Sequence, residues 1–387
     1  MVERQCWMRR ITALLVLGIV GALALTPVAH AAPTRLLVDD DGRGVPGNCN
    51  ANQPTYTRIQ AAVDAAHPGD TIQVCAGTYD EQVVVKKPDL RIVGAGASRT
   101  TIRPSVGSIN TVALATGLPS VAILLIDGVT GVNVRALRLD GSTATLPADC
   151  PPYFGVYYRN ASGTVDSAHV TGVQQCVSVG IFAQSPEDGS GAAEVMIRDT
   201  VVDKYGVAGI ICNEPGTDCM IRSSTITGSG QPNEVTSSGV QIGFGAGGRV
   251  TKSVIRGNLC GQESCGPDPL TQGGAAGILT FQAAPGTVIS ANDLANNDFG
   301  VWLLEGSGCC RTSKNTLTDN RFFGIIIQDG SNQTSNNEIS GGNVGIAAVA
   351  LTANAVATSR DDVIRGTAVA PVQTYSCCGF TAEVIRR

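Results

Sequence analysis

The segments Gly300-Val-Trp-Leu-Leu-Glu305 and Gly324-Ile-Ile-Ile-Gln-Asp329 decide the fold, because their start, a glycine followed by a β-branched residue, recurs along the chain. In steps of 21 to 38 residues, the glycine stands at Gly131, Gly155, Gly180, Gly209, Gly239, Gly277, Gly300, Gly324 and Gly345. A turn of a parallel β-helix places three short strands in roughly 20 to 30 residues, whereas helical repeats need apolar residues at helical spacing. The repeats therefore predict an all-β chain folded as a single-stranded parallel β-helix, with about twelve turns over residues 70–375.

Side chains alternate between the two faces of a strand, so the residue after each glycine is expected to point inward and the next one outward. The inward column is Val132, Val156, Ile181, Ile210, Val240, Ile278, Val301, Ile325 and Ile346. The outward column is Asn133, Tyr157, Phe182, Ile211, Gln241, Leu279, Trp302, Ile326 and Ala347. Most of the outward residues are apolar, so either the 239–277 insertion or the C-terminal tail covers them, or they form a surface for glycan stacking or self-association. In the exposed case, Tyr157 and Trp302 are the expected ligand-binding residues.

Asparagines mark the bends between the expected strands. They are Asn292, Asn296, Asn297, Asn315, Asn320, Asn336 and Asn337. Asparagine tolerates a left-handed backbone, and its amide can bond to the same side chain in the next turn. We interpret these residues as structural.

Residues 1–31 have the features of a secretion signal: a basic Arg9-Arg10 pair, the apolar stretch 11–25 and an Ala29-His30-Ala31 cleavage site. The apolar stretch is shorter than the roughly 20 residues of a membrane span, and no later segment is suited to span a membrane. We therefore expect a secreted or cell-surface protein. Residues 32–69 are expected to form an N-terminal strand and a short capping α-helix at 57–66, and residues 70–387 the β-helix.

The charge balance argues against nucleic acid or an anionic lipid surface as a partner. The chain carries 27 Lys and Arg against 32 Asp and Glu, a formal net charge of −5, and no basic run follows the first ten residues. Without residues 1–31, which hold three basic residues and one acidic residue, the net charge becomes −7. No contact with nucleic acid is expected.

Twelve of the 13 cysteines follow the signal, and an even number in an exported chain favours disulfides. A metal site is not expected, because the chain lacks a C-x2-C pair with a distant pair of histidines. Stacking of successive turns predicts the pair Cys150 with Cys176. Further expected pairs are Cys49 with Cys75, Cys212 with Cys219, and Cys260 with Cys265, although Cys212 has inward parity and could pair elsewhere. The doublets Cys309-Cys310 and Cys377-Cys378 are expected to pair among themselves, in an order that the sequence leaves open.

A resemblance to a known family rests on the opening segment. Residues 56–79 read YTRIQAAVDAAHPGDTIQVCAGTY, and Glu81 and Ile92-Val-Gly-Ala-Gly96 follow. This opening resembles that of secreted bacterial right-handed parallel β-helix proteins of the pectin-lyase-like superfamily. The resemblance implies a right-handed β-helix and contact with carbohydrate. Catalysis in this superfamily depends on local motifs, and those of pectinesterases, polygalacturonases, mannuronan epimerases and pectate lyases are not found here.

Two groups of side chains are weak catalytic candidates. Glu305 and Asp329 stand at the ends of strands in adjacent turns, about 5 Å apart, which would suit a retaining glycosidase, a shared calcium ion or a solvated rim. Asp203 and Lys204, followed by Tyr205, offer the residue types that β-elimination needs, although neighbouring strand residues face opposite ways unless they lie in a bend.

Three functions remain open from the sequence. The first is an exported protein that binds extracellular or cell-envelope carbohydrate without catalysis and without a cofactor, apart from the calcium alternative. The second is a polysaccharide lyase, glycoside hydrolase or epimerase with a non-standard site. The third is a structural surface protein.

Overall fold

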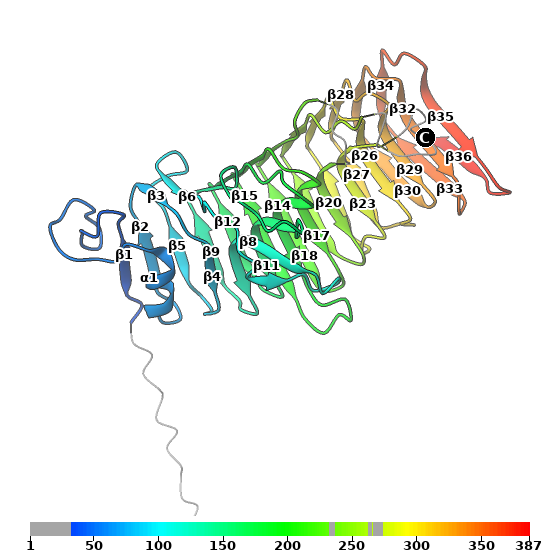
Figure 1. The fold of residues 1–387 in the computed structure, drawn as a ribbon. Coiled ribbons are helices and arrows are strands. Elements are labelled where there is room, and N and C mark those ends of the chain that lie inside the picture. The colour runs from blue at the N-terminus through cyan, green and yellow to red at the C-terminus, as the bar shows by residue number, and fades with distance from the viewer. Residues whose placement is uncertain (1–31, 232–236, 262–264, 266–273) are drawn as a thin grey trace, which may run out of the picture. The chain divides into compact units, whose positions relative to one another are not determined.

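Successive turns of the chain stack so that their strands form three parallel sheets, as Figure 1 shows. This computed structural model describes residues 32–231, 237–261, 265 and 274–387; the predicted signal lies outside these residues. The three sheets have 13, 11 and 12 strands, so the parallel β-helix of about twelve turns is confirmed. We call them sheets 1, 2 and 3, in the order in which the chain visits them in each turn. No helix in the described ranges is long and apolar enough to cross a membrane.

Sheet 1 forms the outer surface that carries the candidate site. Its strands alternate buried and outward residues, as in the pattern BeBiBi of Ala193–Arg198, where B is buried, i half-buried and e exposed. In spatial order they are β1 (Arg35–Val38), β2 (Thr71–Val74), β5 (Arg91–Val93), β9 (Val132–Arg135), β12 (Gly163–Asp166), β15 (Ala193–Arg198), β18 (Thr217–Arg222), β21 (Gly247–Thr251), β24 (Thr287–Ser290), β27 (Cys310–Ser313), β30 (Ser331–Ser335), β33 (Ala355–Arg360) and β36 (Ala382–Arg386).

Sheet 2 consists of strands of three residues, whose middle residue faces the core in most turns. They are β3 (Gly77–Tyr79), β6 (Thr100–Ile102), β10 (Arg138–Asp140), β13 (His169–Thr171), β16 (Val201–Asp203), β19 (Thr225–Thr227), β22 (Val254–Arg256), β25 (Asp293–Ala295), β28 (Thr316–Thr318), β31 (Glu338–Ser340) and β34 (Val363–Arg365).

Sheet 3 contains the Gly-Val and Gly-Ile repeats. Its strands are β4 (Val83–Val85), β8 (Pro119–Asp127), β11 (Tyr153–Arg159), β14 (Ser178–Gln184), β17 (Ala208–Asn213), β20 (Ser238–Gly243), β23 (Ala276–Phe281), β26 (Phe299–Leu304), β29 (Phe323–Gln328), β32 (Val344–Ala350) and β35 (Ala370–Ser376). The short strand β7 (Thr111–Val112) pairs with β8 in the antiparallel sense.

The predicted inward column is confirmed, and all nine of its residues are fully buried. Its first member, however, was assigned to the wrong sheet. Val132 lies in β9 of sheet 1, and the true partner of Val156 in sheet 3 is Leu124 of β8. Strand β8 contains no Gly-Val pair, so the repeat pattern predicts a sheet 3 strand at Gly131 instead. Asn133, the outward residue of that predicted strand, therefore lies on sheet 1 and not on sheet 3.

Two ladders of asparagine side chains support the bends, as predicted. Between sheets 1 and 2, the Nδ2 of Asn292 donates to the Oδ1 of Asn315 (3.0 Å), and the Nδ2 of Asn315 donates to the Oδ1 of Asn337 (2.9 Å). Between sheets 2 and 3, Asn258, Asn297 and Asn320 form a second ladder. Asn296 and Asn336 occupy the left-handed region, each with φ of 54°.

The helix expected at 57–66 is present as α1 (Ile59–Ala65). Its buried residues Ile59, Ala62 and Val63 belong to the same apolar core as Val38 of β1 and Ile72 of β2. Both carboxylate oxygens of Glu81 accept hydrogen bonds from the first helical N–H groups, those of Ile59 (2.6 Å) and Gln60 (2.9 Å). The helix is thereby fixed to the first turn.

All four predicted disulfides between separated cysteines are present. Each doublet closes on itself, Cys309 with Cys310 and Cys377 with Cys378, which settles the order that the sequence left open. Six disulfides favour an oxidising compartment outside the cytoplasm.

Candidate functional site

The outer face of sheet 3, where sugar contact was expected, is covered around Tyr157. This side chain is fully buried, stacks on Phe182 with ring centroids 5.0 Å apart, and donates a hydrogen bond to the Oε1 of Gln184 (2.6 Å). The N–H of Leu114 donates to the hydroxyl of Tyr157 (3.3 Å). This cover comes from the segment before β8, which contains Leu114; part of the 239–277 insertion lies outside the described residues. A ligand cannot reach this ring, so Tyr157 is removed from the candidate site.

Trp302 is half-buried on the same face, further along the stack. Its indole Nε1 donates to the Oε1 of Gln328 (3.1 Å), and its ring meets Phe299 edge-on at 5.0 Å. Neighbouring outward residues Leu279 and Phe281 are half-buried as well. This part of sheet 3 is a small apolar area, and Trp302 remains a candidate contact.

Trp302 allows a direct test of the two outer faces, since it is the one tryptophan left without residues 1–31. We expect acrylamide to quench its emission to an intermediate degree. A polysaccharide bound to sheet 1 should leave quenching unchanged, whereas one bound to sheet 3 should protect the indole. Full shielding of Trp302 in the free protein would remove the sheet 3 surface from consideration.

Glu305 and Asp329 do not form an equivalent carboxylate pair. Asp329 is buried, and its Oδ1 accepts hydrogen bonds from the N–H groups of Leu351 (2.7 Å), Thr352 (2.8 Å) and Ala353 (3.1 Å). Burial raises the pKa of Asp329, but these hydrogen bonds outweigh it, and the pKa is lowered. Glu305 is exposed and accepts from the Nε2 of Gln282 (2.9 Å). Asp329 therefore organises a turn, and Glu305 stands alone at the rim.

Asp203 has a partner that the sequence did not indicate. Its Oδ2 lies 3.0 Å from the Nε2 of His169, and its Oδ1 accepts a hydrogen bond from the hydroxyl of Thr171. Lys204 is exposed at a bend with φ of 51°, whereas the buried Tyr205 donates to the Oδ1 of Asn258 (2.7 Å). Asp203, Lys204 and Tyr205 therefore lie in different environments and do not form one site.

The pair of Asp203 and His169 should affect acid stability. Burial raises the pKa of Asp203, but the hydrogen bonds from His169 and Thr171 outweigh it and lower the pKa. A carboxyl with a lowered pKa contributes stability above its unfolded pKa of about 3.9 and loses it as the pH falls through the folded value. We expect Asp203→Asn to cost roughly 1 kcal/mol at neutral pH. The difference in the free energy of unfolding between Asp203→Asn and the parent should disappear as the pH falls.

Urea unfolding at neutral pH and near pH 2.5 measures this difference, with Asp199→Asn as the control at a neighbouring exposed position. A gap between Asp203→Asn and the parent that stays constant with pH would contradict the assignment.

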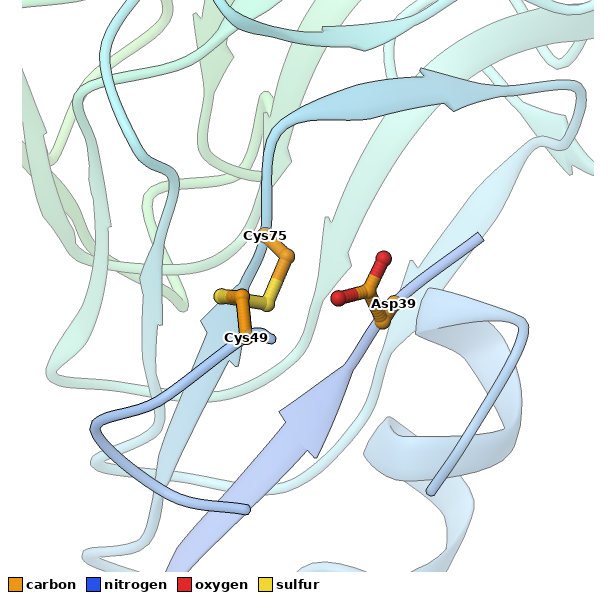
Figure 2. A group of neighbouring side chains, drawn as sticks. All are labelled: Asp39, Cys49 and Cys75. Carbon is orange, nitrogen blue, oxygen red and sulfur yellow. A yellow bond between two sulfur atoms is a disulfide. The ribbon is translucent and has the colours of Figure 1, made fainter. Parts of the chain in front are cut away.

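One group of Asp and Cys side chains in the described part of the chain is close enough to hold a metal ion. Figure 2 shows it: Asp39 beside Cys49 and Cys75. The two sulfur atoms are joined in a disulfide and therefore offer no thiolate to a metal. Asp39 is buried, and burial together with Asp41 and Asp40 raises the pKa of its carboxyl. We assign the group a crosslinking role.

The outer face of sheet 1, by contrast, carries three hollows. One of about 570 Å³ lies over β24, β27 and β30, with Arg249, Arg311 and Gln333 in its lining. Two more, of about 560 Å³ and 440 Å³, lie over β9, β12 and β15 and share Asn133, Thr164 and Met196. Their linings combine guanidinium, amide and hydroxyl groups with a few apolar side chains, which is the composition of a polar ligand site.

Arginines recur on this face because the strands are in register. Arg198 pairs with Arg222 in the next turn, and both point outward. The buried carboxylate of Asp166 lies 2.7 Å from the Nη2 of Arg198 and 3.6 Å from the Nε of Arg135. One carboxylate thus serves two guanidinium groups, and a positive charge remains available to a ligand.

Sequence reasoning missed these arginines, although a signal exists. Arg135, Arg198 and Arg222 each precede a residue with positive φ, namely Ala136 (55°), Asp199 (49°) and Ser223 (50°). Aligning the chain on these bends, as well as on the glycines, would have placed the three arginines in one column.

Comparison with known proteins agrees with the geometry. The family described as "Right handed beta helix region" matches residues 154–360, more than half of the chain, and the chain belongs to this family. The right-handed β-helix expected from the opening segment is thereby confirmed. No curated protein sequence matches the chain.

Two solved structures share the fold. The GH136 lacto-N-biosidase from Eubacterium ramulus is 13% identical, with a TM-score of 0.60 over 89% of this chain and 68% of the other. The periplasmic alginate epimerase AlgG is 11% identical, with a TM-score of 0.51 over 87% of this chain and 84% of the other. At these identities the likeness concerns the fold alone.

Proposed function

We propose that the protein is exported and binds an extracellular or cell-envelope carbohydrate along the outer face of sheet 1, without catalysing a reaction. The observation that carries the proposal is that three hollows lie on this one face. Export is supported by the signal-like residues 1–31 and by the six disulfides.

The chemistry of the face supports a carbohydrate ligand. Arginine, glutamine, asparagine and threonine side chains form hydrogen bonds to hydroxyl and carboxylate groups, and the parallel sheet places such side chains in several successive turns. The two structural neighbours are by name a lacto-N-biosidase and an alginate epimerase, both of which concern carbohydrate. A long glycan could therefore lie across several turns and gain avidity from repeated weak contacts.

Arg311 provides the test. It is exposed in the 570 Å³ hollow, with Val288 and Gln333 as its register neighbours. We expect Arg311→Gln to weaken polysaccharide binding roughly tenfold, because a hydrogen bond to a charged group contributes about 1.5–3 kcal/mol. Isothermal titration of the protein from residue 32 with polygalacturonate, alginate and hyaluronan measures the effect.

Arg256→Gln is the matched control, since Arg256 is also exposed but lies on sheet 2. If Arg311→Gln and Arg249→Gln both bind every ligand as the parent does, the sheet 1 face is not the site. Reducing-end and unsaturated-uronate assays on the same samples test for catalysis. Product formation would favour the alternative of a lyase, hydrolase or epimerase, and self-association without glycan binding would favour a structural surface protein.

A further inference from the structure

Two neighbouring strands of sheet 1 repeat one outward pattern. Strand β15 reads AEVMIR and β18 reads TDCMIR, and they pair in register. Glu194 therefore stands beside Asp218, Met196 beside Met220, and Arg198 beside Arg222. We call these pairs the acidic row, the methionine row and the basic row. Cα atoms in paired strands lie about 4.8 Å apart, so each row is continuous across the two turns.

The rows lie across two adjoining hollows, apart from Arg222, which lines neither of them. The acidic row and the methionine row line the hollow of about 560 Å³, whereas Arg198 lines the hollow of about 440 Å³ together with Arg91 and Arg135. Both hollows include Met196. A ligand that lies along the stack of turns would therefore have carboxylates on one flank and guanidinium groups on the other.

Both flanks carry charged side chains that remain available to a ligand. Neither Glu194 nor Asp218 forms an ion pair with another described residue, and both are exposed. On the basic flank, Asp166 is the single buried carboxylate between Arg135 and Arg198, and the exposed Arg222 adds a further charge. The electrostatic potential thus changes sign over four residues of a strand, a distance of about 13 Å.

The methionine row forms the floor between the flanks. Methionine is usually buried in proteins, yet Met220 is 39% exposed and Met196 is half-buried. Thioether side chains are flexible and polarisable, so they can pack against the apolar face of a sugar ring. The floor supplies contact area without adding charge.

From these rows we infer that this part of sheet 1 selects an amphoteric glycan, in which hexuronate carboxylates alternate with hexosamines that carry free ammonium groups. The inference rests on the proposed function and specifies its ligand. A purely anionic chain would meet the acidic row with like charge, and a purely cationic chain would meet the basic row. A chain with both charges, on opposite edges, can satisfy both rows.

The test compares hyaluronan oligosaccharides with the same oligosaccharides after N-deacetylation, so that an acetamide becomes an ammonium group and nothing else changes. At about pH 6 the amine is charged and the glucuronate remains ionised. We expect the deacetylated form to bind the protein from residue 32 roughly fivefold more tightly, since exposed charge pairs contribute up to about 1 kcal/mol each. The preference should shrink at high salt.

The double variant Glu194→Gln/Asp218→Asn should remove this preference and leave affinity for the acetylated form unchanged or higher. The matched control is Glu338→Gln/Asp293→Asn, two exposed acidic residues on sheet 2, which should keep the preference. Circular dichroism checks that both variants fold.

Equal affinity for the two forms, binding of neither form, or a preference that persists in Glu194→Gln/Asp218→Asn would overturn the inference. The proposed function would survive these results if Arg311→Gln still weakened binding of another polysaccharide. If no polysaccharide bound at all, both would fall together.

Discussion

Ile325→Asp should unfold the protein at markedly lower urea concentration than the parent. Ile325 is fully buried in sheet 3, between Val301 and Ile346 of the neighbouring turns. The substitution removes packed apolar surface and places a carboxylate where the core offers it no polar partner. We expect a loss of at least about 4 kcal/mol in the free energy of unfolding.

The control is Val177→Asp, at a position that is 57% exposed, which should change stability by less than about 0.5 kcal/mol. Equilibrium unfolding followed by circular dichroism and by Trp302 fluorescence measures both variants. A urea unfolding curve of Ile325→Asp equal to that of the parent would mean that the inward column is misassigned.

Asn315→Asp is expected to have the second largest effect, because it changes one nitrogen to oxygen inside a buried ladder. The Nδ2 of Asn315 donates to the carbonyl of Ile289 (3.1 Å) and to the Oδ1 of Asn337 (2.9 Å). An aspartate would place an acceptor against both acceptors, at a residue that is 1% exposed. Two unsatisfied buried groups predict a loss of about 2–4 kcal/mol at neutral pH.

The pH dependence of the stability loss in Asn315→Asp tests whether the missing hydrogen-bond donor causes it. Protonation of the introduced carboxyl restores one donor, so the loss should be smaller near pH 4 than at pH 7. Asn343→Asp, at a half-buried position outside the ladders, is the matched control and should cost little at either pH. An equal loss for both variants would show that the ladder contributes no more than any other asparagine.

Several features of the fold follow from local pattern alone. The inward column could be predicted because side chains alternate along a strand and the turns stack at nearly constant length. The asparagine bends and the pair Cys150–Cys176 follow from the same stacking, since equal positions in successive turns become neighbours. The prediction erred at Gly131, where β8 departs from the repeat motif.

The candidate site could not be predicted in the same way. Burial of Tyr157 depends on the segment before β8, which lies more than 40 residues earlier in the chain and carries no repeat signal. The contact of Asp203 with His169 joins residues 34 positions apart, through the register of sheet 2. Insertions of different length separate the turns, so sequence spacing does not give these distances.

Sequence alone determined the class of fold, the direction of the core residues and the pair Cys150–Cys176, because each depends on a period that the chain repeats. Only the tertiary structure decided which outer face is open. Sheet 3 is covered around Tyr157 by a non-repeating segment, whereas sheet 1 is hollowed along its stack. Whether a face is covered depends on where an irregular segment packs. That packing joins residues far apart in the sequence, and no local repeat period encodes it.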